Sequence, residues 1–211
     1  MNMETISGKS NKLPSLNGVL DRWIEANVSI VRSWSAAKDV PWWYNERASL
    51  SVLAGAVWMD GGIAFEEFVD EKRESGVRRR KNQRYVGPTD IYMKIGKHEF
   101  IGEAKQRWPG AAAKSSNPVT SIENWLNAAC RDVRGIRAFG QRRIGILFAP
   151  LYVNKSARDK INDHIERWIE KIMGVDCSCR AWVFPVEARY ARYSRYEENL
   201  CPGIALLIRE V

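Results

Sequence analysis

The sequence predicts an α/β fold with a central mixed β-sheet flanked by helices. Hydrophobic residues make up 45% of its 211 residues, which is enough to bury one substantial core. Segments with apolar residues at helical spacing alternate with short runs of β-formers. The expected order is helix, strand, hairpin, helix, strand, helix, strand, strand, and interleaving of this kind is typical of an α/β sheet.

Helices are predicted from apolar residues at helical spacing and from residues that begin or end a helix. Asn45 is a good N-cap for the second helix, and Gly61-Gly62 ends it. Thr120 or Ser121 caps the third helix, and the fourth is amphipathic. The expected ranges are 16–34, 46–59, 120–134 and 157–173.

Strands are expected at 63–71 (where a helix is the alternative), 87–105 as a hairpin, 143–153, 180–188 and 203–211. Residues 72–84 are basic and predicted as a loop. The first 12 residues are polar and predicted to be disordered. The expected organisation is therefore a disordered tail plus an N-terminal helix in residues 1–40, followed by one domain in residues 41–211.

Charge and composition narrow the class of partner. The net charge of +8 favours a polyanion. No apolar run reaches the roughly 18 residues of a membrane helix, and the segment MNMETISGKSNK has no apolar core of the signal-peptide kind. We expect a cytoplasmic protein that does not bind membranes, with its four cysteines reduced, since their spacing is not that of a zinc site.

The hairpin in GPTDIYMKIGKHEFIGEAK carries the most informative pattern. Gly96-Lys97 suits a two-residue turn, with Gly first as in a type II′ turn. This turn pairs Ile95 with His98, and the same register places Asp90 directly opposite Glu103. Directly opposed residues share a face of the sheet, and like charges there are destabilising.

Two interpretations of these opposed carboxylates are open. Lys105 lies two residues beyond Glu103, so it shares the same face and can offset part of the repulsion. A divalent cation would offset more, because carboxylate oxygens are ligands that Mg²⁺ prefers. The alternative is that both acids are solvated at a sheet edge, and a register slip of one residue would separate Asp90 from Glu103.

Asp90 followed by Glu103-Ala104-Lys105 resembles the D…(D/E)-x-K signature of the PD-(D/E)XK nuclease superfamily, which has the restriction-endonuclease-like fold. Pro88 lies two residues before Asp90 rather than one, which is a departure from the pattern. The family core runs helix, three strands, helix, strand, and residues 46–149 are similar to it in that order. The resemblance implies a restriction-endonuclease-like core with an N-terminal helical extension.

The resemblance also implies roles for individual residues. Asp90 and Glu103 would bind Mg²⁺ (or Mn²⁺) with the Ala104 carbonyl as a further ligand, and Lys105 would position the attacking water and favour its deprotonation. Glu46 matches an acid that many members carry on the first helix, although an acid in a first helical turn also complements the helix dipole without any catalytic role. Other acidic candidates are Glu66, Glu67 and Asp70.

The implied function is metal-dependent hydrolysis of nucleic acid, with DNA as the expected substrate and internal cleavage as the expected mode. The alternative is a non-catalytic nucleic-acid-binding module on the same fold, and a homodimer is left open. Candidate phosphate contacts are basic residues before the hairpin and on the third helix, each of which could instead lie on a solvated charged face. These are Arg78, Arg79, Arg80, Lys81, Arg84, Arg131 and Arg134.

Overall fold

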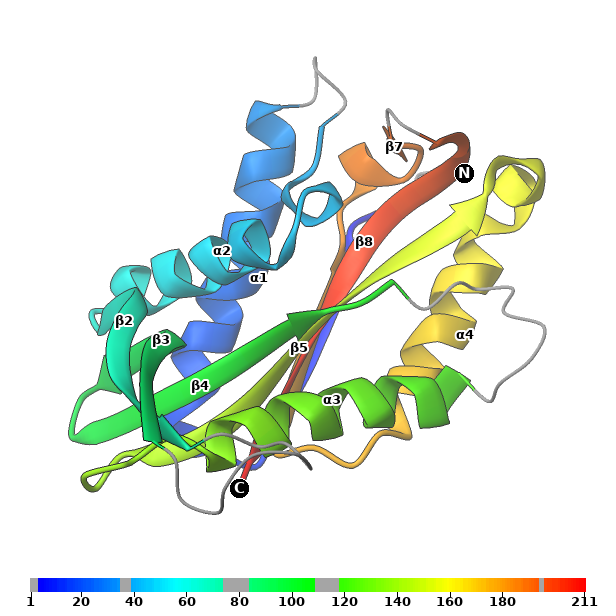
Figure 1. The fold of residues 1–211 in the computed structure, drawn as a ribbon. Helices are drawn as coiled ribbons and strands as arrows, with labels where there is room; N and C mark the ends of the chain where they lie inside the picture. Colours follow the sequence, from blue (N-terminus) through cyan, green and yellow to red (C-terminus); the bar gives the residue numbers. More distant parts are fainter. Residues whose placement is uncertain (1–3, 35–38, 74–83, 109–117, 194–195) are drawn as a thin grey trace.

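The computed structural model describes residues 4–34, 39–73, 84–108, 118–193 and 196–211. These described residues form one eight-stranded mixed sheet with helices on both faces (Figure 1), which confirms the predicted α/β class. The helices are α1 Asn17–Ser33, α2 Glu46–Met59, α3 Pro118–Arg134 and α4 Ile161–Met173. The strands are β1 Ile6–Asn11, β2 Ile63–Arg73, β3 Arg84–Ile95, β4 His98–Gln106, β5 Arg142–Asn154, β6 Cys179–Phe184, β7 Arg192–Tyr193 and β8 Tyr196–Glu210.

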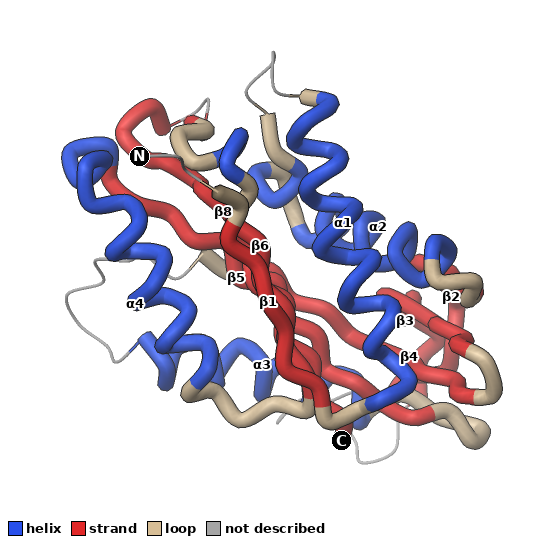
Figure 2. The backbone as a smooth tube through the Cα atoms, turned by 180° about the vertical axis from the view of Figure 1, so that it is seen from behind, coloured by secondary structure: helices blue, strands red, loops and turns tan. Residues whose placement is uncertain are grey.

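The strand order is β1-β6-β8-β5-β4-β3-β2, with β7 pairing β8 off this path. Among the described strands, β4 and β5 pair in parallel and the other neighbours pair antiparallel. Helices α1 and α2 cover one face of the sheet, and α3 and α4 cover the other (Figures 1 and 2). In the described part of the chain, no helix is long and apolar enough to cross a bilayer.

Alternation along the central strand β5 produces a core on each face. Ile144, Ile146 and Phe148 belong to the cluster under α1 and α2, while Leu147 and Leu151 belong to the cluster under α3 and α4. Successive side chains of a strand point to opposite faces, so an almost continuous apolar run is what a strand covered on both faces requires. The strand predicted at residues 143–153 is therefore confirmed and is buried on both faces.

Several predicted boundaries agree with the structure because local interactions set them. The side chain of Asn45 accepts a hydrogen bond from the Ala48 N–H at 3.0 Å, and α2 ends at the predicted residue, two positions before Gly61. The two-residue turn at Gly96-Lys97 is confirmed, and Gly96 has the positive φ of +56° that both primed hairpin turns need. The ambiguous segment after Gly62 is the strand β2.

The N-terminal residues correct one prediction. Residues 6–11 were expected to be disordered, yet they form β1 and pair antiparallel with β6, from Ile6 with Phe184 to Asn11 with Cys179. An edge strand obtains its stability from backbone pairing with its neighbour, so polar side chains do not prevent it. Helix α1 also places Leu20 and Trp23 in the same core cluster as the sheet, so the N-terminal segment belongs to the main body of the fold.

Three further boundaries differ from the predictions by four residues or more. The first part of the expected helix 157–173 is a 3₁₀ segment, Lys155–Lys160, and α4 starts only at Ile161. Strand β6 ends at Phe184 because Pro185, which follows it, lacks an N–H for the ladder. The last strand is longer than expected: β8 starts at Tyr196 rather than at residue 203.

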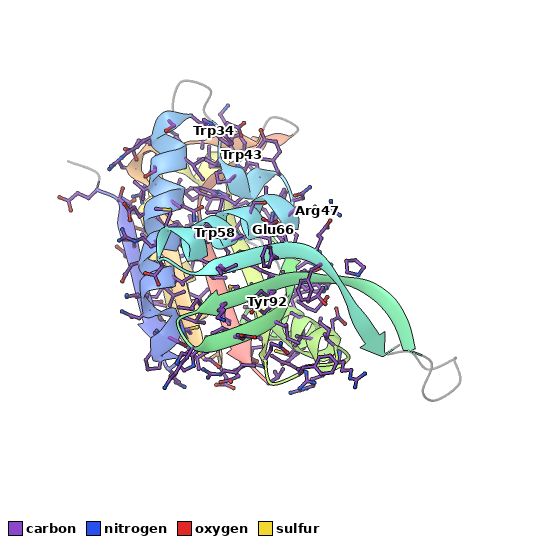
Figure 3. The ribbon with its side chains drawn as sticks, turned by 90° about the vertical axis from the view of Figure 1, so that its left-hand side faces the viewer. Trp34, Trp43, Arg47, Trp58, Glu66 and Tyr92 are labelled. Carbon is purple, nitrogen blue, oxygen red and sulfur yellow. The ribbon has the colours of Figure 1, made fainter. Side chains whose placement is uncertain are left out.

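The hairpin of β2 and β3 positions the candidate site. These two strands leave the body of the sheet together as an arm (Figure 3). The β3–β4 pairing runs from Ile95 with His98 to Ile91 with Gly102 and ends there, whereas β4 stays paired with β5 as far as Gln106. Among the described strands, the last four residues of β4 therefore have a neighbour on one side only.

Candidate active site

Two carboxylates occupy the side of β4 that β3 leaves open. Asp90 accepts a hydrogen bond from the Ala104 N–H at 2.7 Å, and Glu46 accepts one from the Gln106 N–H at 2.9 Å. N–H groups two residues apart in a strand point to the same side, so both acids lie along one edge of β4. They bind the backbone N–H groups of the two residues that flank Lys105, and we call this arrangement the bracket around Lys105. It brings together three of the predicted catalytic residues, namely Asp90, Glu46 and Lys105.

The sheet is interrupted at Asp90 towards β2 as well. The β2–β3 pairs before and after Glu67 share one register, which places Glu67 opposite Asp90, yet these two residues are not paired. Glu67 has a φ of +51°, a left-handed conformation that costs a non-glycine residue about 1 kcal/mol or more. Its carboxylate lies 2.5 Å from the Arg47 guanidinium of α2. Asp90 is thus freed from regular pairing on both sides.

Glu46 begins α2 and is half-buried. Its pKa is raised, first because burial disfavours the charged carboxylate and further because of the negative charge of Asp90. The positive charge of Lys105 and the Gln106 N–H act in the opposite direction. Glu46, Asp90 and Lys105 therefore lie close enough to influence one another's charge. The alternative for Glu46 was a favourable interaction with the helix dipole alone, and the structure shows these further interactions.

Lys105 forms an ion pair that the sequence analysis did not anticipate. Its ammonium lies 3.0 Å from a carboxylate oxygen of Asp132 on α3. Burial acts to lower the pKa of Lys105, but the hydrogen bond and charge of Asp132, followed by the charges of Glu46 and Asp90, outweigh it and raise the pKa. Lys105 is therefore a stable cation at neutral pH.

A signal for Asp132 was present in the sequence. It lies three residues after Ala129, which is a buried residue of the same helix. Residues three apart lie on one side of a helix, so this spacing places Asp132 beside the buried side of α3. The predicted Arg131 and Arg134 on the same helix are exposed.

Glu103 is buried, with 6% of its surface exposed. The predicted hairpin register is confirmed up to Ile91 and Gly102, but the next pair, Asp90 with Glu103, is absent from the ladder. The carboxylate of Asp90 instead reaches the Ala104 N–H. An ion shared by Asp90 and Glu103 stays a prediction.

The oxygen donors at this site suit a hard cation. Carboxylates and a backbone carbonyl are the donor types that Mg²⁺ and Mn²⁺ take in proteins. Burial is the main cause of the raised pKa of Glu46, and a cation would offset the further contribution from the negative charge of Asp90. Within the described ranges, no three His, Cys, Asp or Glu side chains are grouped closely enough to hold a metal. The predicted ligands are two acidic side chains, Asp90 and Glu103, and the Ala104 carbonyl. This set does not require three acidic, histidine or cysteine side chains to be grouped together.

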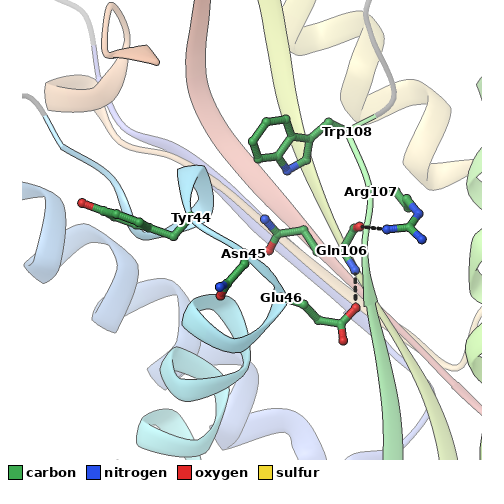
Figure 4. Close-up of a pocket in the computed structure, with 6 residues that line it drawn as sticks. All are labelled: Tyr44, Asn45, Glu46, Gln106, Arg107 and Trp108. Atoms are coloured by element: carbon green, nitrogen blue, oxygen red, sulfur yellow. Dashed lines mark hydrogen bonds between the residues drawn. The ribbon is translucent and has the colours of Figure 1, made fainter. Parts of the chain in front are cut away.

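A pocket of about 460 Å³ lies beside Glu46 (Figure 4). The residues that line it come from the start of α2 and the end of β4, namely Tyr44, Asn45, Glu46, Gln106, Arg107 and Trp108. At its base Gln106 is buried, and its amide accepts from the Ser49 hydroxyl at 2.6 Å and donates to the Trp42 carbonyl at 3.2 Å. Sequence analysis missed this pocket because its two walls are about 60 residues apart in the chain.

The remaining predicted residues fall into two groups. Arg78, Arg79, Arg80 and Lys81 lie outside the described residues, and Arg84 is the first residue of β3. Of the alternative acids, Glu66 is exposed and accepts a hydrogen bond from the Ser51 hydroxyl at 3.0 Å.

Comparison with known proteins adds no family to these observations. No family model matches the chain, and neither the curated proteins nor the solved structures include a significant match.

Proposed function

We propose that this protein is a metal-dependent nuclease that hydrolyses phosphodiester bonds in nucleic acid, with DNA as the expected substrate. The observation that carries the proposal is the bracket around Lys105, in which Asp90 and Glu46 bind the two flanking amides. The element order from α2 to β5, which is helix, three strands, helix, strand, supports it, as does the net charge of +8.

Asp90, Glu103 and the Ala104 carbonyl would hold Mg²⁺ or Mn²⁺, which when bound polarises the phosphate and stabilises charge on the leaving oxygen. Because the pKa of Lys105 is raised, its ammonium keeps its proton and acts as a cation that orients the attacking water and favours hydroxide. It is not the base.

Glu46 is the candidate general base. A carboxylate with a raised pKa holds a proton more strongly, and a catalytic base works best when its pKa approaches the working pH. In the proposed step the water oxygen bonds to phosphorus, its proton passes to Glu46, the phosphorus–oxygen ester bond breaks, and the leaving oxygen takes a proton from solvent.

A non-catalytic nucleic-acid-binding module is the second candidate, and one observation favours it. Asp90 and Glu46 satisfy the N–H groups that β4 exposes where β3 departs, and unpaired amides in a part-buried site are costly. The two acids therefore have a structural role whether or not chemistry takes place.

Cleavage of linear, circular and single-stranded DNA with Mg²⁺, and with a chelator in its place, tests the proposal. We expect Mg²⁺-dependent cleavage that Asp90→Asn and Lys105→Met reduce by at least about 100-fold, the scale for loss of a positioned catalytic group. Glu66→Gln is the matched acidic control because Glu66 lies on the exposed surface, and it should cleave normally. Cleavage by the folded Asp90→Asn variant at the normal rate would contradict the mechanism.

A further inference from the structure

The pocket beside Glu46 has exposed aromatic side chains at its rim. Tyr44 and Trp108 have 57% and 36% of their surfaces exposed, and both line the cavity of about 460 Å³. Pockets for small ligands measure about 300–1,000 Å³, so this one has room for a nucleobase and its sugar. In Figure 4 the Trp108 ring lies beside Gln106, on the side opposite Glu46.

The two amide side chains that line this pocket, those of Gln106 and Asn45, already make hydrogen bonds within the protein. The Gln106 oxygen accepts from Ser49, and its nitrogen donates to Trp42. The Asn45 oxygen caps α2 by accepting from Ala48. The acceptor oxygens of both amides are therefore engaged, and only N–H donors remain for contact with a base, whereas an aromatic face accepts any base by stacking.

The positively charged side chain of Arg107 is held in place by its neighbours, and Arg107 also lines this pocket. The Arg107 guanidinium lies 4.1 Å from the centre of the Trp125 ring and donates to the Gln106 carbonyl at 2.9 Å, and the residue is exposed. An arginine held in place beside a base-sized pocket provides a positive charge for the phosphate backbone that accompanies the base.

We propose that this pocket binds one unpaired nucleotide of the substrate, with its base stacked on Trp108 and with no preference for base identity. The proposal deepens the function proposed above and rests on it for the placement of the scissile phosphate near Glu46. A base within a duplex is stacked between its neighbours and enters such a pocket only if it is extruded at a cost of a few kcal/mol. The preferred substrate is therefore single-stranded nucleic acid or the unpaired end of a duplex.

Fluorescence anisotropy with short labelled oligonucleotides in a chelating buffer measures binding without cleavage. Stacking is worth about 1–3 kcal/mol per base, so Trp108→Ala should weaken single-strand binding by about 5- to 150-fold and leave duplex binding nearly unchanged. Trp108→Phe, which keeps an aromatic face, should restore most of the affinity. Trp58→Ala removes a comparably exposed tryptophan at the other end of α2 and should bind as the unmodified protein does.

Three results would overturn the proposal: unchanged single-strand affinity in a folded Trp108→Ala variant, equal losses for single strand and duplex, or affinities for oligothymidine and oligoadenosine that differ by more than about tenfold. Cleavage tests the underlying function separately. If Asp90→Asn abolishes cleavage while Trp108→Ala binds normally, the stacking site is wrong and the nuclease stands. If the unmodified protein never cleaves but Trp108→Ala loses single-strand binding, the stacking site is supported and the protein is a non-catalytic binding module.

Discussion

Lys105 and Asp132 form an ion pair of 3.0 Å that connects the strand carrying the candidate site to helix α3. Burial acts to lower the pKa of Lys105, and Asp132 is the strongest of the groups that raise it. A raised lysine pKa contributes stability that is fully present below the ordinary value of 10.5 and is lost as the pH rises through the higher value in the folded protein.

Asp132→Asn should therefore lower the pKa of Lys105, since the charges of Glu46 and Asp90 alone then oppose burial. The fall of kcat/KM at high pH should begin at a lower pH in this variant, and a pH–rate profile measures it. Asp163→Asn, an exposed acid at the start of α4, is the control that should leave the profile in place. An alkaline limb that does not move in Asp132→Asn would show that the ion pair does not control Lys105.

Glu46→Gln should stabilise the protein at neutral pH in the absence of divalent ions. The pKa of Glu46 is raised above 4.5 in the folded state, so the folded protein binds its proton more tightly than the unfolded chain does. The folded protein consequently loses stability as the pH rises from below 4.5 through the pKa of Glu46 in the folded state. Glutamine does not ionise, so it removes this loss, and its side-chain oxygen can still accept a hydrogen bond from the Gln106 N–H. Urea unfolding at pH 4 and pH 7.5 in a chelating buffer measures the effect, and a variant that gains nothing at pH 7.5 relative to pH 4 would contradict it.

Ser49→Ala should destabilise the protein by about 1–3 kcal/mol, because it leaves the buried Gln106 side-chain oxygen without its hydrogen-bond donor. Ser51→Ala, in the same helix, removes an exposed hydroxyl that donates to the exposed Glu66 and should change stability by less than about 0.5 kcal/mol. Chemical denaturation of both variants provides the comparison. Equal effects of the two substitutions would mean that the Ser49–Gln106 contact does not hold α2 against β4.

The basic segment before β3 gives a prediction from the sequence alone. If Arg78, Arg79 and Arg80 contact phosphates, each lost contact should lower the salt slope of duplex binding by about 0.9. Their triple replacement by alanine should weaken binding at low salt about equally for unrelated sequences, because phosphate contacts do not read bases. Binding isotherms across a salt series measure the slope, and an unaltered slope would place the binding surface elsewhere.

The parts of the structure that the sequence determined by itself depend on neighbours along the chain. Asn45 caps α2 through a residue three positions ahead, and the Gly96-Lys97 turn sets the β3–β4 register by its length and backbone conformation. That register also predicted that Asp90 lies beside β4, the strand that carries Lys105. Local chemistry therefore yielded the fold class, most element boundaries and part of the candidate site.

Tertiary structure decided the rest through contacts between residues far apart in the chain. The polar segment 6–11 becomes a strand only because β6 offers it backbone partners. Glu46 meets Gln106 across 60 residues, and Lys105 meets Asp132 on a different element. The amides that the acids bind are open because the residues of β3 before Ile91 do not pair with β4, and no local sequence pattern predicts where two strands separate. Composition and periodicity report which face of an element is buried, whereas the partner that fills a vacant hydrogen-bonding edge is set by how the whole chain packs.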